Sequence, residues 1–153
     1  MLKVTFLELL VRGLPEAFIM ILATYTLANK KVEKKEYLTS SLIMALVMYL
    51  VRMLPINYGV HTILNIFVLI FLTFNVNKID LIVSIKSSIL ILMILFICEG
   101  VNIGFIQFVL HKDLKVIFSD SMSKMILGIP STIAFFAIVI IYYIISLKKG
   151  KLK

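Results

Sequence analysis

Five long apolar segments, separated by short polar loops, make up almost the whole chain. They cover about residues 4–28, 37–54, 60–74, 80–110 and 125–147. A helix needs ~20 mostly apolar residues to cross the hydrocarbon core of a bilayer. Inside lipid its backbone groups must also pair within the protein. The pattern therefore predicts an all-α fold: a polytopic membrane helical bundle with about five transmembrane helices, formed by residues 1–153 as a single membrane domain.

The composition supports a membrane protein and argues against a soluble one. Hydrophobic residues make up 61% of the chain and charged residues only 16%, against roughly 25% charged residues in an average soluble domain. The net charge of +8 does not indicate nucleic-acid binding, because the lysines occur in short clusters between apolar runs and no basic face carries stacking aromatics. The expected environment is the lipid bilayer.

The five segments are not equally clear. Only 125–147 is long enough and free of charged residues. The segment 60–74 is short, so 37–54 and 60–74 could instead form a re-entrant hairpin that enters the membrane and returns. Residues 111–124 read as a polar connector with some amphipathic character, and 148–153 as a basic tail that stops transfer and anchors to lipid headgroups.

The distribution of basic residues predicts the orientation, because loops rich in Lys and Arg stay in the cytoplasm. Ten basic residues fall on one side of the predicted membrane: Lys30, Lys31, Lys34, Lys35, Lys78, Lys86, Lys148, Lys149, Lys151 and Lys153. Five fall on the other: Lys3, Arg52, Lys112, Lys115 and Lys124. We therefore expect the N-terminus outside and the C-terminus in the cytoplasm, in the cytoplasmic membrane of a bacterium.

The first apolar segment carries three charged residues on one helical face. Glu8, Arg12 and Glu16 are spaced i, i+4 and i+8, so each neighbouring pair could form an ion pair along the helix. An unpaired charge at the centre of a membrane costs roughly 2.5–3.5 kcal/mol on insertion scales. Pairing would offset part of that cost, so the three residues have two open interpretations: a purely structural set of ion pairs, or a ligand or ion site.

Other polar residues fall in the same, predicted outer, half of the bundle. Arg52 and His61 flank the turn between the second and third segments, and Glu99 lies in the outer half of the fourth. We interpret these residues as the lining of an outward-facing polar pocket. The predicted ligand-binding residues are Glu8, Arg12, Glu16, Arg52, His61 and Glu99. For His61, next to a turn, a solvated or helix-capping role is the alternative.

No catalytic pattern stands out. The sequence has no HExxH, no GxSxG and no paired aspartates on a membrane helix, so the nucleophile or metal that a membrane hydrolase needs has no candidate. Cys98 is the single cysteine, in an apolar run and without a CxxC or Cys/His spacing. We therefore expect no enzyme activity, no metal site and no cofactor.

Two short stretches resemble a known family. They are RGLPEAF at 12–18 and YLVRMLPINYGVHT at 49–62. They are similar to the membrane-embedded N-terminal sensor modules of sensor histidine kinases of low-GC Gram-positive bacteria, and to short stand-alone relatives of these modules. The frequent lysine, isoleucine and asparagine residues suit such an AT-rich genome. The resemblance covers about the first two-thirds of the chain.

The resemblance implies a sensory or regulatory module that detects an external ligand. The sequence ends at Lys153 with neither a phospho-acceptor histidine domain nor an ATP-binding domain. Signalling is then expected to pass through a partner, either a histidine kinase or another membrane protein.

The alternative function is a small-molecule or ion transport component, such as the substrate-binding membrane subunit of an uptake system; a holin-like lysis protein is a third. Gly100 and Gly104 have GxxxG spacing, which more often marks ordinary helix packing than a specific contact. A homo-oligomer is compatible with the sequence.

Overall fold

The computed structural model describes residues 9–54, 58–108 and 121–151. Helix accounts for 88% of the structure, and no strand occurs in the described part. A π-helical turn, η1 (Leu9–Gly13), leads directly into α2 (Leu14–Leu27). The other helices are α3 (Lys34–Met53), α4 (Tyr58–Asn75), α5 (Leu81–Phe108) and α7 (Ser121–Lys148). Four or five helices are long and apolar enough to span a membrane, which confirms the predicted all-α membrane bundle.

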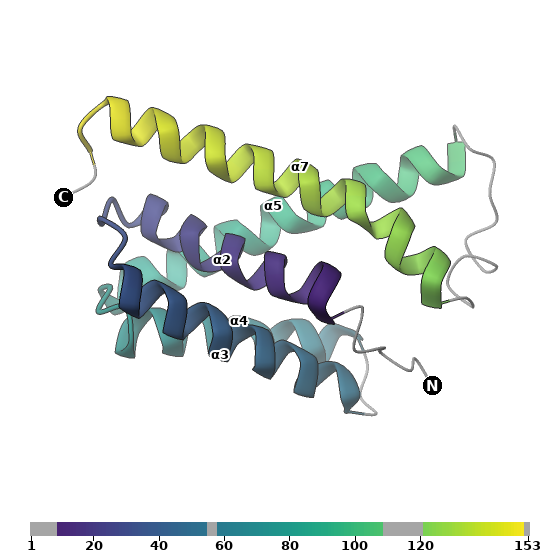
Figure 1. Cartoon of the computed structure of the whole chain (residues 1–153), viewed down its shortest axis with the longest axis horizontal. Coiled ribbons are helices and arrows are strands. Elements are labelled where there is room, and N and C mark those ends of the chain that lie inside the picture. The colour runs from purple at the N-terminus through teal and green to yellow at the C-terminus, as the bar shows by residue number, and fades with distance from the viewer. Residues whose placement is uncertain (1–8, 55–57, 109–120, 152–153) are drawn as a thin grey trace.

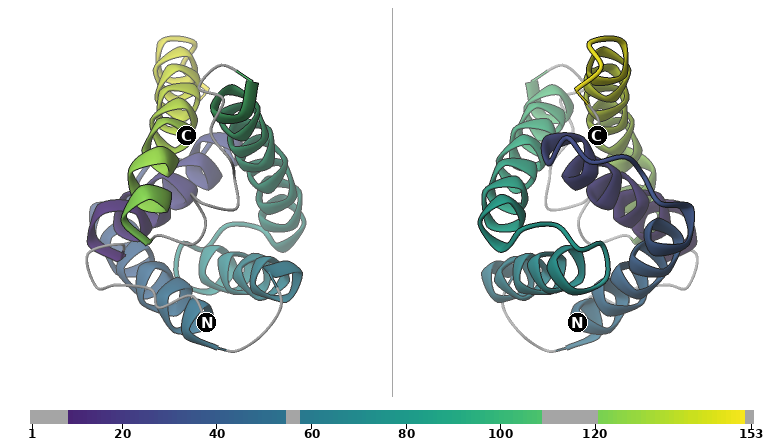
Figure 2. Two further views of the ribbon diagram at one scale, coloured as in Figure 1. Left: turned by 90° about the vertical axis from the view of Figure 1, so that its right-hand side faces the viewer. Right: turned by 90° about the vertical axis from the view of Figure 1, so that its left-hand side faces the viewer.

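Successive helices run in alternating directions along the long axis of the bundle (Figure 1). The C-terminal ends of α2, α4 and α7 therefore meet at one end, which we call the lysine-rich end after Lys30, Lys78, Lys148, Lys149 and Lys151. Figure 2 shows α2 in the middle, with α3 and α4 on one side and α5 and α7 on the other. Consistent with this central place, 56% of the span Leu10–Leu27 is buried, against 33% or less for the other spans.

Every long helix contributes a large side chain to the centre of the bundle. Tyr25, Met44, Leu69, Ile91 and Phe135, one from each helix, are fully buried. The outer surface is just as apolar: Phe67 and Phe71 on α4 are 66% and 64% exposed. A soluble bundle would present polar residues there, so these exposed faces indicate that lipid is the surrounding solvent.

Three buried threonines are satisfied by their own helices. Thr24, Thr26 and Thr73 donate hydrogen bonds to the carbonyls of Met20, Leu22 and Leu69, each four residues earlier. This bond removes the cost of a bare hydroxyl in an apolar interior. Buried threonines in this bundle therefore do not by themselves mark a site.

The predicted segments agree with the helices to within a few residues, with one larger difference. Helix α7 begins at Ser121 rather than at 125, because helical hydrogen bonding continues through serine and lysine residues that hydropathy assigns to a loop. Residues 4–8 and 109–120, which include most of the predicted connector 111–124, lie outside the described residues. Helix α3 has 20 residues, about 30 Å, the length of a full crossing. The apolar part of α4, Val60–Asn75, is shorter than the four candidate spans, so the re-entrant hairpin stays an alternative prediction.

The GxxxG pair does not pack inside this bundle. A Cβ atom added to Gly100 or Gly104 would have nothing within 4 Å. Neither glycine therefore marks a close approach of another described helix, and a role of the pair in helix packing stays a prediction.

Candidate functional site

Arg12 of η1 forms an ion pair with Glu99 of α5. The guanidinium Nη2 lies 2.6 Å from Oε1 of Glu99, and the two side chains are 13% and 33% exposed. This distance is that of a short, charge-assisted hydrogen bond. The pair therefore joins the start of the central helix to the C-terminal half of α5.

Glu16 of α2 forms a second ion pair, with Arg52 at the end of α3. Oε2 of Glu16 lies 3.3 Å from Nη2 of Arg52. The Glu16 side chain is only 5% exposed and that of Arg52 is 26% exposed. The carboxylate is thus buried in the bundle while its partner reaches in from a more accessible position, as arginine side chains do near the ends of membrane helices.

The predicted pairing of Arg12 with Glu16 along one helix differs from what the structure shows. Each residue pairs across the bundle, Arg12 with α5 and Glu16 with α3. The reason lies in η1, whose wider π-helical turn contains Arg12 and ends just before α2. Pro15, in the first turn of α2, lacks the N–H that would continue a regular ladder. The wider turn changes the register between the two residues, so they face different neighbours.

Helix α7 approaches Arg12 closely at Gly128. A Cβ atom at this position would lie 2.6 Å from Nη1 and 3.1 Å from Cζ of Arg12, closer than real Cβ contacts allow. Glycine therefore leaves the space that the guanidinium fills. Arg12 thus touches two helices at once, α5 through its ion pair and α7 through this packing contact.

Helix α7 contains Pro130, and side chains donate to backbone carbonyls just before it. Proline has no N–H to donate to the carbonyl one turn earlier, that of Ile126. Nearby, Ser131 Oγ donates to the carbonyl of Gly128 at 2.7 Å, and Asn102 Nδ2 on α5 donates to the carbonyl of Leu127 at 2.7 Å. Asn102 therefore fixes α5 to the part of α7 that precedes Pro130, one turn from Glu99.

One hydrogen-bond donor of Arg12 has no described partner. Nε of Arg12 is buried and, within the part of the chain that the structure describes, makes no hydrogen bond. A buried donor of this kind usually has an ordered water, a ligand or a further side chain as its acceptor. The Nε–H group of Arg12 is thus a hydrogen-bond donor without a described acceptor, next to the Arg12–Glu99 ion pair.

The structure brings four of the six predicted site residues into two neighbouring ion pairs: Arg12, Glu16, Arg52 and Glu99. We call these four residues the charged cluster. His61 lies in the first turns of α4 at the same end of the bundle and is half-buried; its place in a ligand site stays a prediction. Glu8 lies outside the described residues. Sequence reasoning missed Gly128, for which the only signal was its position two residues before a proline.

A second polar network, at the lysine-rich end, was not predicted from the sequence. Nζ of Lys30 donates to the carbonyl of Asn77 at 2.6 Å, and Nζ of Lys78 lies 3.3 Å from Oε1 of Glu36. Asn77 is fully buried. This network fastens the loop after α2 to the turn after α4, and its only sequence signal was the two glutamates within a lysine-rich loop.

The described residues contain no group of three or more His, Cys, Asp and Glu side chains arranged to hold a metal ion. Cys98 is buried in α5. Comparisons of the chain with protein-family models, with curated proteins and with solved structures find no match.

Proposed function

We propose that this chain is a sensory or regulatory membrane module, which detects a small charged ligand at the charged cluster and signals through a partner protein. The observation that carries the proposal is that one arginine–glutamate pair holds the η1–α2 segment to α3 and another holds it to α5. A ligand charge that replaces one member of a pair changes a contact between helices directly. Binding and helix packing are then coupled, as a sensor requires.

The chemistry of the cluster favours a ligand with a carboxylate or phosphate group. Arginine presents planar N–H groups that match such anions with two hydrogen bonds. In Arg12, Nη2 is used by Glu99 while the buried Nε has no described acceptor. An incoming anion would therefore bind the Nε edge first and then compete with Glu99.

Helix α7 is the natural element to carry the change. It packs against Arg12 at Gly128 and continues from there to Lys148, at the lysine-rich end. The distribution of lysines supports a cytoplasmic location for that end, and hence an external location for the charged cluster. A shift of α7 would reach a cytoplasmic or membrane partner without a separate signalling domain.

The resemblance of residues 12–18 and 49–62 to sensor modules supports a histidine kinase as the partner, in a bacterial cytoplasmic membrane. Those two stretches contain Arg12, Glu16 and Arg52, three of the four residues of the charged cluster. Self-association is a further route by which such a module could act.

The test measures the thermal stability of the purified chain in detergent with acetate, inorganic phosphate, glycine and a simple amine. The proposal expects an anion to raise the melting temperature of the wild type and not that of Arg12→Gln, while Lys35→Gln, an exposed charge outside the cluster, responds like the wild type. Recovery of a kinase with the tagged chain should then depend on that anion. Uptake of the labelled anion by vesicles containing the chain would instead show transport, and no anion-specific shift in any variant would refute the proposal.

A further inference from the structure

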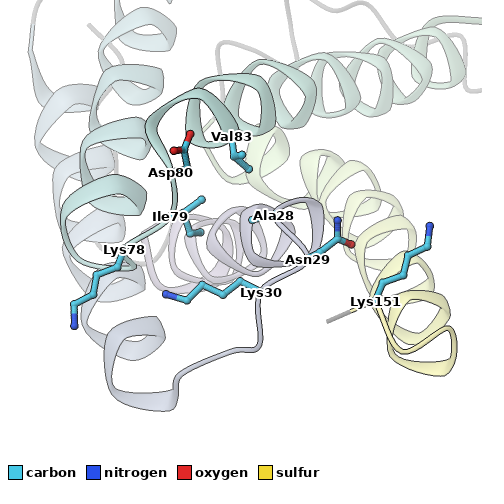
Figure 3. A pocket seen from close by; sticks show the side chains of 8 residues that line it. All are labelled: Ala28, Asn29, Lys30, Lys78, Ile79, Asp80, Val83 and Lys151. Atoms are coloured by element: carbon cyan, nitrogen blue, oxygen red, sulfur yellow. The ribbon is translucent and has the colours of Figure 1, made fainter. Parts of the chain in front are cut away.

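A cleft opens at the lysine-rich end, where three helices finish. Its lining comes from the residues after α2, from the turn between α4 and α5, and from the residues after α7, and its volume is about 670 Å³. This volume lies within the usual range for small-molecule sites. In Figure 3, Lys30 and Lys78 lie on one side of the cleft and Lys151 on the other.

The lining is basic. It contains three lysines, Lys30, Lys78 and Lys151, and one carboxylate, Asp80. The surrounding loops and helix ends, 27–36, 75–81 and 147–151, contain eight lysines and three acidic residues. Positive charge of this density attracts anions at a membrane surface.

The acidic residue in the cleft already has a role. Oδ1 of Asp80 accepts a hydrogen bond from the backbone N–H of Ile82 at 2.9 Å, so it caps the first turn of α5. Glu36, just outside the lining, lies 3.3 Å from Lys78 and 4.0 Å from Lys30, and Glu33 also lies 4.0 Å from Lys30. Two carboxylates therefore serve Lys30 and Lys78, while Lys151 forms no ion pair with a described residue, which leaves positive charge in excess over the three lysines.

The lysines stand at defined places rather than on a loose loop. Asn29 and Gly150 have φ values of 53° and 61°, and the N–H groups of the residues that follow, Lys30 and Lys151, return to the carbonyls of Tyr25 and Ser146. At each of these helix ends one residue has the left-handed backbone conformation, which fixes the direction of the chain after α2 and α7. Lys78 also has a positive φ, of 51°. Three helix ends therefore hold three lysines around one cleft.

We infer that this cleft, between Lys30, Lys78 and Lys151, binds the phosphate of an anionic lipid headgroup. Loops at the end of a transmembrane bundle lie at the level of the headgroups, where basic pockets between helices take such lipids. Lys78 is 76% exposed at its side chain and Lys151 is exposed, so both can turn onto a phosphate at the rim. Lys30, fixed on Asn77, forms the inner wall.

The site and the charged cluster lie at opposite ends of the bundle, so failure of one proposal leaves the other intact. The test counts lipid molecules retained by the purified chain in detergent, by native mass spectrometry, with phosphatidylglycerol or phosphatidylcholine as the probe. Detergent removes the membrane surface, so a retained lipid reports a discrete site. The wild type should retain phosphatidylglycerol in preference to phosphatidylcholine.

The deciding variants are Lys78→Gln/Lys151→Gln and the matched control Lys34→Gln/Lys35→Gln. Both lose two exposed lysines from the same end, and only the first pair lines the cleft. We expect binding of phosphatidylglycerol to weaken roughly tenfold in the first variant and little in the control. Lys30 is left in place because its bond to Asn77 supports the fold.

Three results would overturn the inference. Equal weakening in both variants would show diffuse attraction by the whole end. Unchanged binding in both would mean that the lysines only offset the negative ends of α2, α4 and α7. Displacement of the lipid by inorganic phosphate, but not by sulfate at equal ionic strength, would identify a site for free phosphate instead.

Discussion

The guanidinium of Arg12 and the carboxylate of Glu99 lie 2.6 Å apart, although 87 residues separate them in the chain. The contact closes the bundle between its first and fourth long segments, at the point where Gly128 of α7 also meets the arginine. Three helices therefore depend on one side chain. Replacing Arg12 should therefore disturb the packing of all three helices.

Replacing Arg12 by glutamine should destabilise the bundle, and replacing Glu99 as well should partly restore it. The single change leaves the Glu99 carboxylate without its guanidinium in a mostly apolar setting, at an expected cost of about 1–3 kcal/mol, less than for a fully buried pair because Glu99 is a third exposed. Thermal unfolding in detergent of both single variants and the double variant measures the coupling between them.

Lys86→Gln is a suitable control for that cycle, because it removes an exposed charge from the same helix α5. Its melting temperature should stay close to that of the wild type. Strictly additive effects of the Arg12 and Glu99 substitutions would mean that the ion pair contributes nothing to stability.

Replacing Gly128 by alanine should destabilise the chain through Arg12. The new Cβ would lie 2.6 Å from Nη1, and the guanidinium cannot simply move aside because Glu99 holds it. We expect a loss of about 1–2 kcal/mol, typical of overpacking, measured by the same unfolding assay. Gly100→Ala, with nothing within 4 Å of the new atom, should be neutral or slightly stabilising.

The double variant Gly128→Ala/Arg12→Ala tests the cause. Shortening the arginine removes the atoms that the new methyl group would meet, so the double variant should be more stable than the sum of the two single losses predicts. A purely additive result would mean that Gly128→Ala destabilises the chain through the backbone of α7 and not through its contact with Arg12.

The fold was predictable because lipid imposes a simple rule on the sequence. A segment must be apolar for the length of a crossing, so the limits of α3, α4 and α5 follow from hydropathy to within a few residues. The start of α7 was missed, since a charged residue such as Lys124 ends an apolar run without ending a helix. Hydropathy indicates whether a segment lies in lipid or in water, but it does not show where the hydrogen bonding of a helix begins.

The members of the charged cluster were predictable from the sequence, and their ion-pair partners were not. Depth along a helix can be counted from sequence, and this placed Arg12, Glu16 and Glu99 at one end of the bundle. Partners depend on rotation about the helix axis, which the π-helical turn η1 alters. The contacts of Gly128 with Arg12 and of Lys30 with Asn77 depend on tertiary packing alone, so no local pattern could reveal them.

The orientation predicted from the lysines has a direct test. In a Cys98→Ala background, single cysteines at Lys31 and at Lys149 should react with a membrane-impermeant thiol reagent only after the cells are opened. Both positions are exposed at the lysine-rich end, for which the excess of basic residues predicts a cytoplasmic location. A cysteine at Met53, exposed at the opposite end, is the matched control and should react in intact cells. The reverse pattern would invert the bundle and move the charged cluster to the cytoplasmic side.

The Glu16–Arg52 pair should respond unequally to the loss of its two members. Arg52→Gln leaves a carboxylate whose side chain is only 5% exposed, whereas Glu16→Gln leaves an arginine that is 26% exposed and can reach water or headgroups. We therefore expect Arg52→Gln to lower the free energy of unfolding by about 2–4 kcal/mol and Glu16→Gln to lower it by less. Both values come from thermal unfolding in detergent, with Glu33→Gln, an exposed carboxylate, as the reference. If Glu16→Gln proved the more costly change, Arg52 rather than Glu16 would be the more strongly desolvated member of the pair.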